Sequence, residues 1–239
     1  MVHNEFVVNF RAVVWKEALE SVRTLKYLLV LTVLLVIVMM YLPVSTILNA
    51  QGLSAQAKGV LLGSTSLYIP LMIIPVVGNT AVYRALYEER RNRTIQILLA
   101  FGVPPSDLWL GKLTVAVAIS CLTSLITILG YNLAARLLTG ISVIMEMKLW
   151  LIVLIVMPIL AIGALALISV AYWWLRSGQA IGMLFPMVAF LGGWNLSLKY
   201  CLEYPTLQIS IVSLLAGLIL VAVSYIGVSF ISKERISYF

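Results

Sequence analysis

GVLLGSTSLYIPLMIIPVVGNTAVY, residues 59–83, contains no charged side chain in 25 residues and stops at Arg84. A helix of this length exceeds the roughly 20 residues that cross the hydrocarbon core of a bilayer. Five further stretches of 22 to 31 residues are also free of charge: 27–57, 113–135, 149–175, 177–198 and 204–232. None alternates like a strand of a transmembrane barrel, so each predicts a membrane-spanning helix.

The composition of the chain supports the same fold class. Of its 239 residues 62% are hydrophobic and only 10% are charged, against about 25% charged residues in an average soluble domain. The sequence therefore predicts an all-α integral membrane protein, with an N-terminal helix in residues 1–26 and a six-span domain in residues 27–239. The expected spans are about 27–48, 65–84, 113–135, 149–172, 179–198 and 207–231.

Residues 5–26 have the pattern of an amphipathic helix that lies at the membrane surface. Trp15 and Leu19 belong to a broad apolar face, and Lys16, Glu17 and Glu20 belong to the opposite face, whereas Phe6, Arg11 and Val13 interrupt the pattern. The apolar run that follows is too long for a signal peptide, so we expect a retained first span. The amphipathic helix is either an interfacial anchor or also contacts a cytoplasmic partner through its charged face.

The basic residues indicate the orientation. If the N-terminus is cytoplasmic and the spans alternate, 12 of the 16 Lys and Arg residues lie inside and four lie outside. This distribution obeys the positive-inside rule, whereas the inverted topology violates it. We therefore expect both termini in the cytoplasm and a multi-pass protein of the plasma membrane.

The residues that commonly carry enzyme chemistry are scarce. The chain has a single histidine, His3, and two cysteines, Cys121 and Cys201, which do not have metal-ligand spacing. It contains neither a Gly-x-x-x-x-Gly-Lys-Ser/Thr loop nor the motifs of the common membrane hydrolases. We therefore expect no catalytic residues, no metal and no bound cofactor, and no segment is large enough for a nucleic-acid groove.

The loop 84–112 is the longest polar segment on the predicted inside. Its first part is charged and should continue the second span as a helix into the cytoplasm. Gly102 can end this helix, Pro104 and Pro105 should prevent its resumption, and Ser106 or Asp107 can cap the next helix. From the residues alone, a solvated hairpin that only sets the topology is about as good an explanation as a binding element.

The same loop resembles the cytoplasmic loop of ABC-2 type permeases, the membrane subunits of many ATP-binding-cassette exporters. The matching positions are Glu88, Glu89, Arg90, Thr94, Leu98, Leu99, Pro104, Gly111 and Lys112. Arg93 and Gln96 depart from the pattern, because Gly and Glu are usual there. The amphipathic first helix, the six spans and the chain length also fit, so the resemblance covers essentially the whole chain.

The resemblance implies a dimeric permease, of two copies or of two related chains, whose halves are each bound to a separate ATPase subunit that holds ATP and Mg²⁺. The loop would form a coupling helix in a groove of the ATPase, flanked by the interfacial helix. Leu98 and Leu99 would be buried in the groove, with Glu89, Arg90 and Arg91 at its rim. The implied coupling residues are Glu88, Glu89, Arg90, Arg91, Thr94, Leu98, Leu99, Pro104 and Lys112.

The third span carries a set of polar residues near one face: Ser120, Thr123, Ser124, Thr127 and Tyr131. Interhelical packing with back-bonding to helix carbonyls is the first explanation, and Ser213 with Gly217 suggests another packing patch. The alternative is that Ser120, Ser124 and Thr127 line a transport path. Apart from Arg84 at the end of the second predicted span, no charged residue lies within a predicted span, which argues against a transporter driven by protons or sodium ions.

Three functions are compatible with these features. The first is the permease of an exporter driven by a separate ATPase. The second is a related permease of the haem-export or cytochrome-assembly type. The third is a membrane scaffold or assembly protein that transports nothing. The sequence identifies no cargo.

Overall fold

The computed structural model describes residues 10–20, 54–140, 150–174 and 206–231, together with scattered positions between 30 and 52. The regular structure in these parts is helical, which confirms the all-α part of the predicted fold class. Residues 10–20 form an N-terminal helical segment. The elements that follow are α2 (Ala55–Val82), η1 (Tyr83–Glu88), α3 (Glu89–Arg91), α4 (Thr94–Ala100), α5 (Pro105–Thr139), η2 (Ile152–Val156), α7 (Met157–Trp174) and α9 (Thr206–Ser229).

Four helices within the described residues are long and apolar enough to cross a membrane. They cover residues 57–91, 105–139, 152–174 and 210–229, and they correspond to the predicted second, third, fourth and sixth spans. The predicted span 179–198 lies outside the described residues, and so does much of the span 27–48. The count of six spans and the orientation of the termini therefore stay predictions.

The second and third helices are longer than predicted. The expected spans were 65–84 and 113–135, whereas α2 begins at Ala55 and α5 extends from Pro105 to Thr139. The charge-free stretch marks only the part of a helix that lipid can cover. At about 1.5 Å per residue, a 35-residue helix is about 52 Å long and reaches past a hydrocarbon core of about 30 Å.

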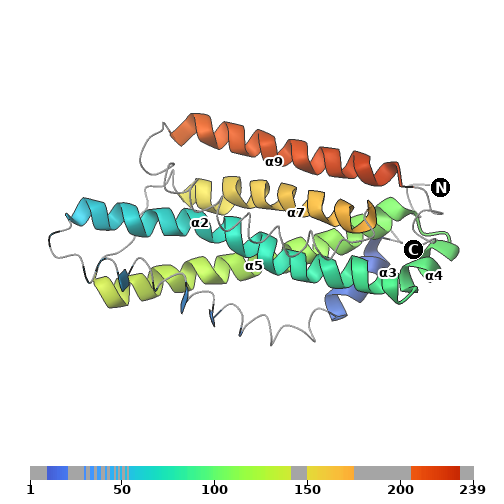
Figure 1. Cartoon of the computed structure of the whole chain (residues 1–239), viewed down its shortest axis with the longest axis horizontal. Coiled ribbons are helices and arrows are strands. Elements are labelled where there is room, and N and C mark those ends of the chain that lie inside the picture. The colour runs from blue at the N-terminus through green and yellow to red at the C-terminus, as the bar shows by residue number, and fades with distance from the viewer. Residues whose placement is uncertain are drawn as a thin grey trace.

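The long helices run side by side (Figure 1). α2 packs along α5 and α7, and α9 packs along α7. α2 is largely buried, whereas most of α9 is exposed and apolar, with Val212, Ile219 and Ile226 each more than half exposed. An apolar outer surface is expected where the surroundings are lipid.

Two glycines let α7 and α9 approach closely. A Cβ on Gly163 would lie 2.5 Å from the carbonyl oxygen of Gly217, and a Cβ on Gly217 would lie 2.7 Å from the carbonyl oxygen of Ile159. Ser213, one turn from Gly217, is buried. The predicted small-residue patch at Ser213 and Gly217 is thus a helix-packing contact, as is common between membrane helices.

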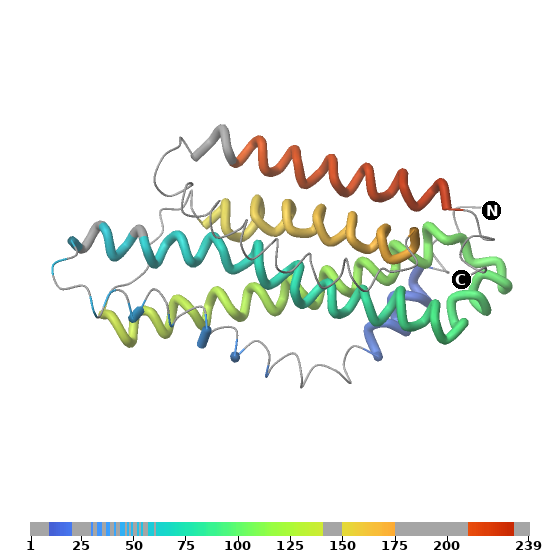
Figure 2. Tube along the Cα trace, in the orientation of Figure 1, coloured from blue at the N-terminus to red at the C-terminus, as the bar shows by residue number. Residues whose placement is uncertain are grey.

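The N-terminal helical segment lies at the end of the bundle that carries α3 and α4 (Figures 1 and 2). It is helical as predicted, but a different face contacts the protein. Val13 and Glu17, which are one turn apart, are buried, whereas Trp15 and Leu19 are exposed. Glu17 was expected on the exposed polar face. Its burial follows from a cation on α5, described below.

Candidate functional site: the segment between the second and third long helices

Residues 84–112 form a helical hairpin at one end of the bundle. α2 continues through η1 and α3 as far as Arg91, so the charged sequence extends the apolar helix as predicted. α4 follows after a two-residue turn, and four residues, 101–104, separate the end of α4 from the start of α5. The stretch η1 is a π-helix, a distortion that is frequently found at functional sites.

The turn between α3 and α4 depends on Arg93. This residue has φ 62° and ψ 9°, a left-handed conformation that is uncommon for residues other than glycine. The N–H of Arg93 donates to the carbonyl of Arg90 at 3.1 Å, and the carbonyl of Arg93 accepts from Ile97 at 3.3 Å. Position 93 is also where the resembling loops usually carry Gly, so the departure in sequence falls at a position of backbone strain.

α4 ends in a Schellman motif at Gly102. The N–H of Val103 donates to the carbonyl of Leu98 at 3.3 Å, and the N–H of Gly102 donates to Leu99 at 3.1 Å, with φ 87° at Gly102. The predicted helix stop is therefore confirmed. Pro104 is the N-cap of α5 and Pro105 is its first residue.

The expected cap of α5 was wrong. Ser106 or Asp107 was predicted to cap this helix, yet both lie within its first turn, and Ser106 donates to the Asp107 carboxylate at 3.1 Å. Pro105 starts the helix, because the first helical position needs no N–H donor and suits the fixed φ of proline. Asp107 is still placed favourably, since a carboxylate near a helix N-terminus interacts well with the helix dipole.

Arg90 connects this segment to α7. Its side chain is buried, and Nη1 donates to the carbonyl oxygens of Tyr172 at 3.0 Å and of Trp173 at 3.2 Å. These carbonyls belong to the last turn of α7, where a cation interacts well with the helix dipole. Arg90 was expected at the rim of a partner's groove, and its burial within the chain corrects that prediction.

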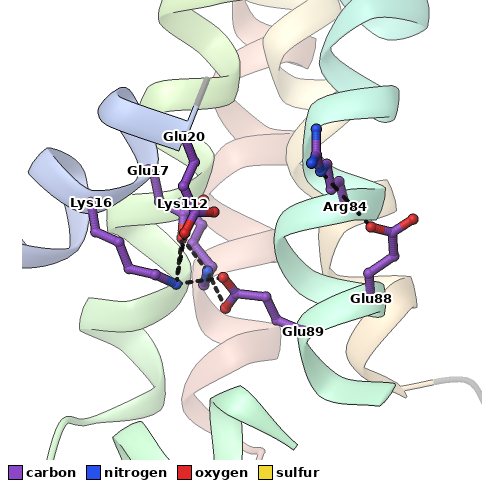
Figure 3. A network of polar contacts seen from close by, with 7 residues as sticks. All are labelled: Lys16, Glu17, Glu20, Arg84, Glu88, Glu89 and Lys112. Carbon is purple, nitrogen blue, oxygen red and sulfur yellow. Dashed lines mark hydrogen bonds and ion pairs between the residues drawn. The ribbon is translucent and has the colours of Figure 1, made fainter. Parts of the chain in front are cut away.

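A second connection is centred on Lys112 (Figure 3). Its side chain is 1% exposed, and its ammonium group donates to the carboxylates of Glu17 and, at 2.7 Å, of Glu89. The other oxygen of Glu89 accepts from Lys16 at 2.5 Å. We call Lys16, Glu17, Glu89 and Lys112 the buried ion cluster. It joins the N-terminal helical segment, α3 and α5.

Gly111 explains why the N-terminal helical segment can come so close to α5. A Cβ at this position would lie 2.6 Å from Cγ1 and 2.9 Å from Cβ of Val13. The Gly111-Lys112 pair thus has two separate roles, since Gly111 provides room for Val13 and Lys112 binds Glu17. Sequence reasoning identified the pair only through the resemblance.

Burial and the neighbouring charges have opposite effects on the pKa values of the cluster. Burial opposes the charge of Lys16, but the hydrogen bond and the attraction of Glu89 outweigh it and raise its pKa above the ordinary 10.5. Burial is the largest influence on Glu17 and raises its pKa above 4.5, although Lys112 acts in the opposite direction. Glu17, Glu20 and Glu89 also have the spacing of a metal site, but each of these carboxylates already pairs with the ammonium group of Lys16 or Lys112.

The apolar residues of α4 divide between two faces. Leu99 and Ile95 are buried in the core, and Leu98 is partly buried against it. Ile97 is 57% exposed and Phe101 is 82% exposed. The prediction that Leu98 and Leu99 are the apolar residues available to a partner is therefore wrong for Leu99. The spacing of Ile97 and Phe101, one turn apart, was the signal that could have identified this second face.

The remaining residues of the predicted site are less involved in packing. Glu88 and Arg91 are exposed, Thr94 and Pro104 are partly exposed, and Arg84 approaches Glu88 to 3.9 Å at the surface. An exposed pair of this kind contributes about 0–1 kcal/mol. The predicted coupling residues are therefore close together in the chain but do not share one surface.

The three residues considered as an alternative path lining, Ser120, Ser124 and Thr127, lie inside the helix bundle. Ser120 and Thr127 are fully buried and donate to the carbonyls of Val117 and Thr123 in their own helix. Ser124 is also buried and has no hydrogen-bond partner among the described residues. Ser120 contacts the position where a Cβ on Gly78 would lie, at 3.3 Å. These contacts favour the packing explanation over a path lining.

Comparison with known proteins identifies the wider group to which this arrangement belongs. The family model described as ABC-2 family transporter protein matches residues 11–218. The match includes most of the N-terminal helical segment, all of residues 84–112 and the first half of α9. No curated protein and no solved structure matches the chain.

Proposed function

The chain belongs to the ABC-2 transporter family, and from this premise we propose that it is the permease subunit of an exporter driven by a separate ATPase. Family membership and the apolar helices show a multi-pass membrane protein of the transporter permease type. The proposal adds that two permease subunits form the export path in the plasma membrane. It also places residues 84–112 in the cytoplasm, where an ATPase subunit that holds ATP and Mg²⁺ docks on α4.

The exposed apolar face of α4 is the observation that carries the proposal. Phe101 and Ile97 lie at the outer side of a helix whose inner side is held in the core by Ile95 and Leu99. An aromatic side chain exposed on a rigid support is typical of a central contact in a protein interface. Because α4 lies beyond the apolar parts of α2 and α5, lipid is not expected to cover this face.

The attachments of the hairpin support a role in coupling. Arg90 binds the end of α7, Lys112 binds α3 and the N-terminal helical segment, and Trp109 donates to Ser169 of α7 at 2.7 Å. A displacement of α4 by a partner would therefore be transmitted to several spans through buried polar contacts. Such contacts are rigid when they are fully satisfied.

Replacement of Phe101 by Asp tests the proposal. Phe230, which follows α9 and is 75% exposed, provides the matched control. Phe101→Asp should abolish co-purification with the ATPase in mild detergent and the stimulation of ATP turnover, since a charge would enter an apolar groove. Phe230→Asp should preserve both. If the Phe101 variant keeps full ATPase binding and transport, α4 is not the docking element, and a scaffold function gains support if no ATPase associates at all.

A further inference from the structure

Exposed apolar and basic residues follow one another in the stretch 91–101, which we call the stripe. Ile97 and Phe101 are one turn apart at the outer side of α4, and Arg93, the left-handed N-cap of α4, comes four residues before Ile97. All three are exposed, and so is the neighbouring Arg91. We propose that the docking groove of the partner ATPase is an apolar pocket for Phe101 and Ile97 bordered by acidic side chains. This inference rests on the proposed function and specifies the chemistry of its partner.

The charges around α4 determine the expected sign of the charge on the partner's surface. Glu88 and Glu89 already have cationic neighbours, because Glu89 binds Lys16 and Lys112 and Glu88 is close to Arg84, whereas Asp107 is buried in the first turn of α5. Arg91 and Arg93 form no ion pair within the part of the chain that the structure describes. The unpaired exposed charge at the start of α4 is therefore positive. A complementary partner surface must be acidic, which also accelerates association.

An anionic membrane surface is the other structure that such a stripe could contact. The length of the second long helix argues against it. Its charge-free part, residues 59–83, is 25 residues and about 37 Å long, which already covers a hydrocarbon core of about 30 Å. Residues 84–91 extend the helix by about 12 Å more before the chain turns into α4. The stripe is therefore expected beyond the headgroups, within reach of a soluble subunit.

Affinity measurements with the purified ATPase and the full-length permease test the inference. In detergent and in nanodiscs of zwitterionic lipid, the double variant Arg91→Glu, Arg93→Glu should weaken ATPase binding about tenfold or more at low salt. The loss should shrink at 1 M salt, where the screening length is about 3 Å. Phe101→Ala should cost about 30-fold at both salt concentrations, as expected of a central contact.

Arg136→Glu is the matched control, because Arg136 is exposed at the opposite end of α5. It should leave the ATPase affinity unchanged. A Lys substituted for an acidic groove residue of the ATPase should restore binding to the Glu variants. The inference is overturned if wild-type permease binds the ATPase but the charge reversal has no effect. It is also overturned if the effect appears only in nanodiscs that contain anionic lipid. Failure of wild-type permease to bind any ATPase would refute the proposed function instead.

Discussion

Replacement of Lys112 by Met tests the buried ion cluster most severely. The substitution keeps an unbranched side chain, one heavy atom shorter and without charge, and leaves the carboxylates of Glu17 and Glu89 with Lys16 as their remaining cation. Removing one partner of a buried ion pair typically costs about 3–5 kcal/mol. Most of this energy should be lost from the contact between residues 10–20 and the hairpin, because α5 keeps its apolar packing. The docked state should therefore become about 150- to 4,000-fold less favourable.

Hydrogen exchange measured by mass spectrometry reports this contact directly. In Lys112→Met, peptides that cover residues 10–20 should lose protection by a factor of this size, whereas peptides from α2 should change little. Glu17→Gln should cost less, since burial already disfavours the charged form of Glu17. The double variant Glu17→Gln, Lys112→Met should recover part of the loss, as expected for groups in direct contact. Unchanged protection in Lys112→Met, or strictly additive losses in the double variant, would refute the role of the cluster.

Three further predictions concern local structure. Arg93→Gly should raise the free energy of unfolding by about 0.5–1 kcal/mol, because glycine adopts the left-handed backbone conformation of this position without strain. A lower melting temperature in the variant would contradict this. Gly217→Ala should lower the free energy of unfolding by about 1–3 kcal/mol, because the added Cβ would clash with the carbonyl of Ile159. Gly63→Ala should be tolerated, because a Cβ at Gly63 would have no neighbouring atom within 4 Å. The raised pKa of Lys16 means that its contribution is complete below pH 10.5 and disappears as the pH rises through the higher folded-state value. The difference in melting temperature between wild type and Lys16→Met should therefore be constant from neutral pH, where the partner carboxylates are charged, up to pH 10.5 and decrease above it. A difference that vanishes between neutral pH and about pH 10 would contradict the assignment.

The long helices could be predicted from the sequence because a span in lipid excludes charged side chains along its whole length. Runs without charge identified the helices at 57–91, 105–139, 152–174 and 210–229, and Gly102 correctly marked the end of α4. The bounds of α2 and α5 were too short, because both helices continue after the apolar residues end. The ends of these helices lie outside the predicted apolar spans, where contacts with neighbouring helices and not lipid stabilise them.

The faces of the hairpin could not be predicted in the same way. Arg90 and Arg91 are adjacent basic residues in a charged run, yet one caps α7 and the other is exposed. Successive residues point about 100° apart around a helix, and only the positions of the neighbouring helices determine which one is buried. Leu99 and Phe101 differ for the same reason. The partner of Glu17, Lys112, lies 95 residues away, and no local pattern links them.

The central claim is that the exposed end of α4 docks on an ATPase. A cysteine at Phe101 in a background with Cys121→Ser and Cys201→Ser, treated with a short bismaleimide in native membranes, tests it most directly. We expect a cross-linked product that contains the permease and its ATPase, and we expect none when the cysteine replaces Phe230 instead. A permease that transports normally but whose Phe101 position cross-links to no ATPase, or reacts with an impermeant thiol reagent from outside the cell, would contradict the account.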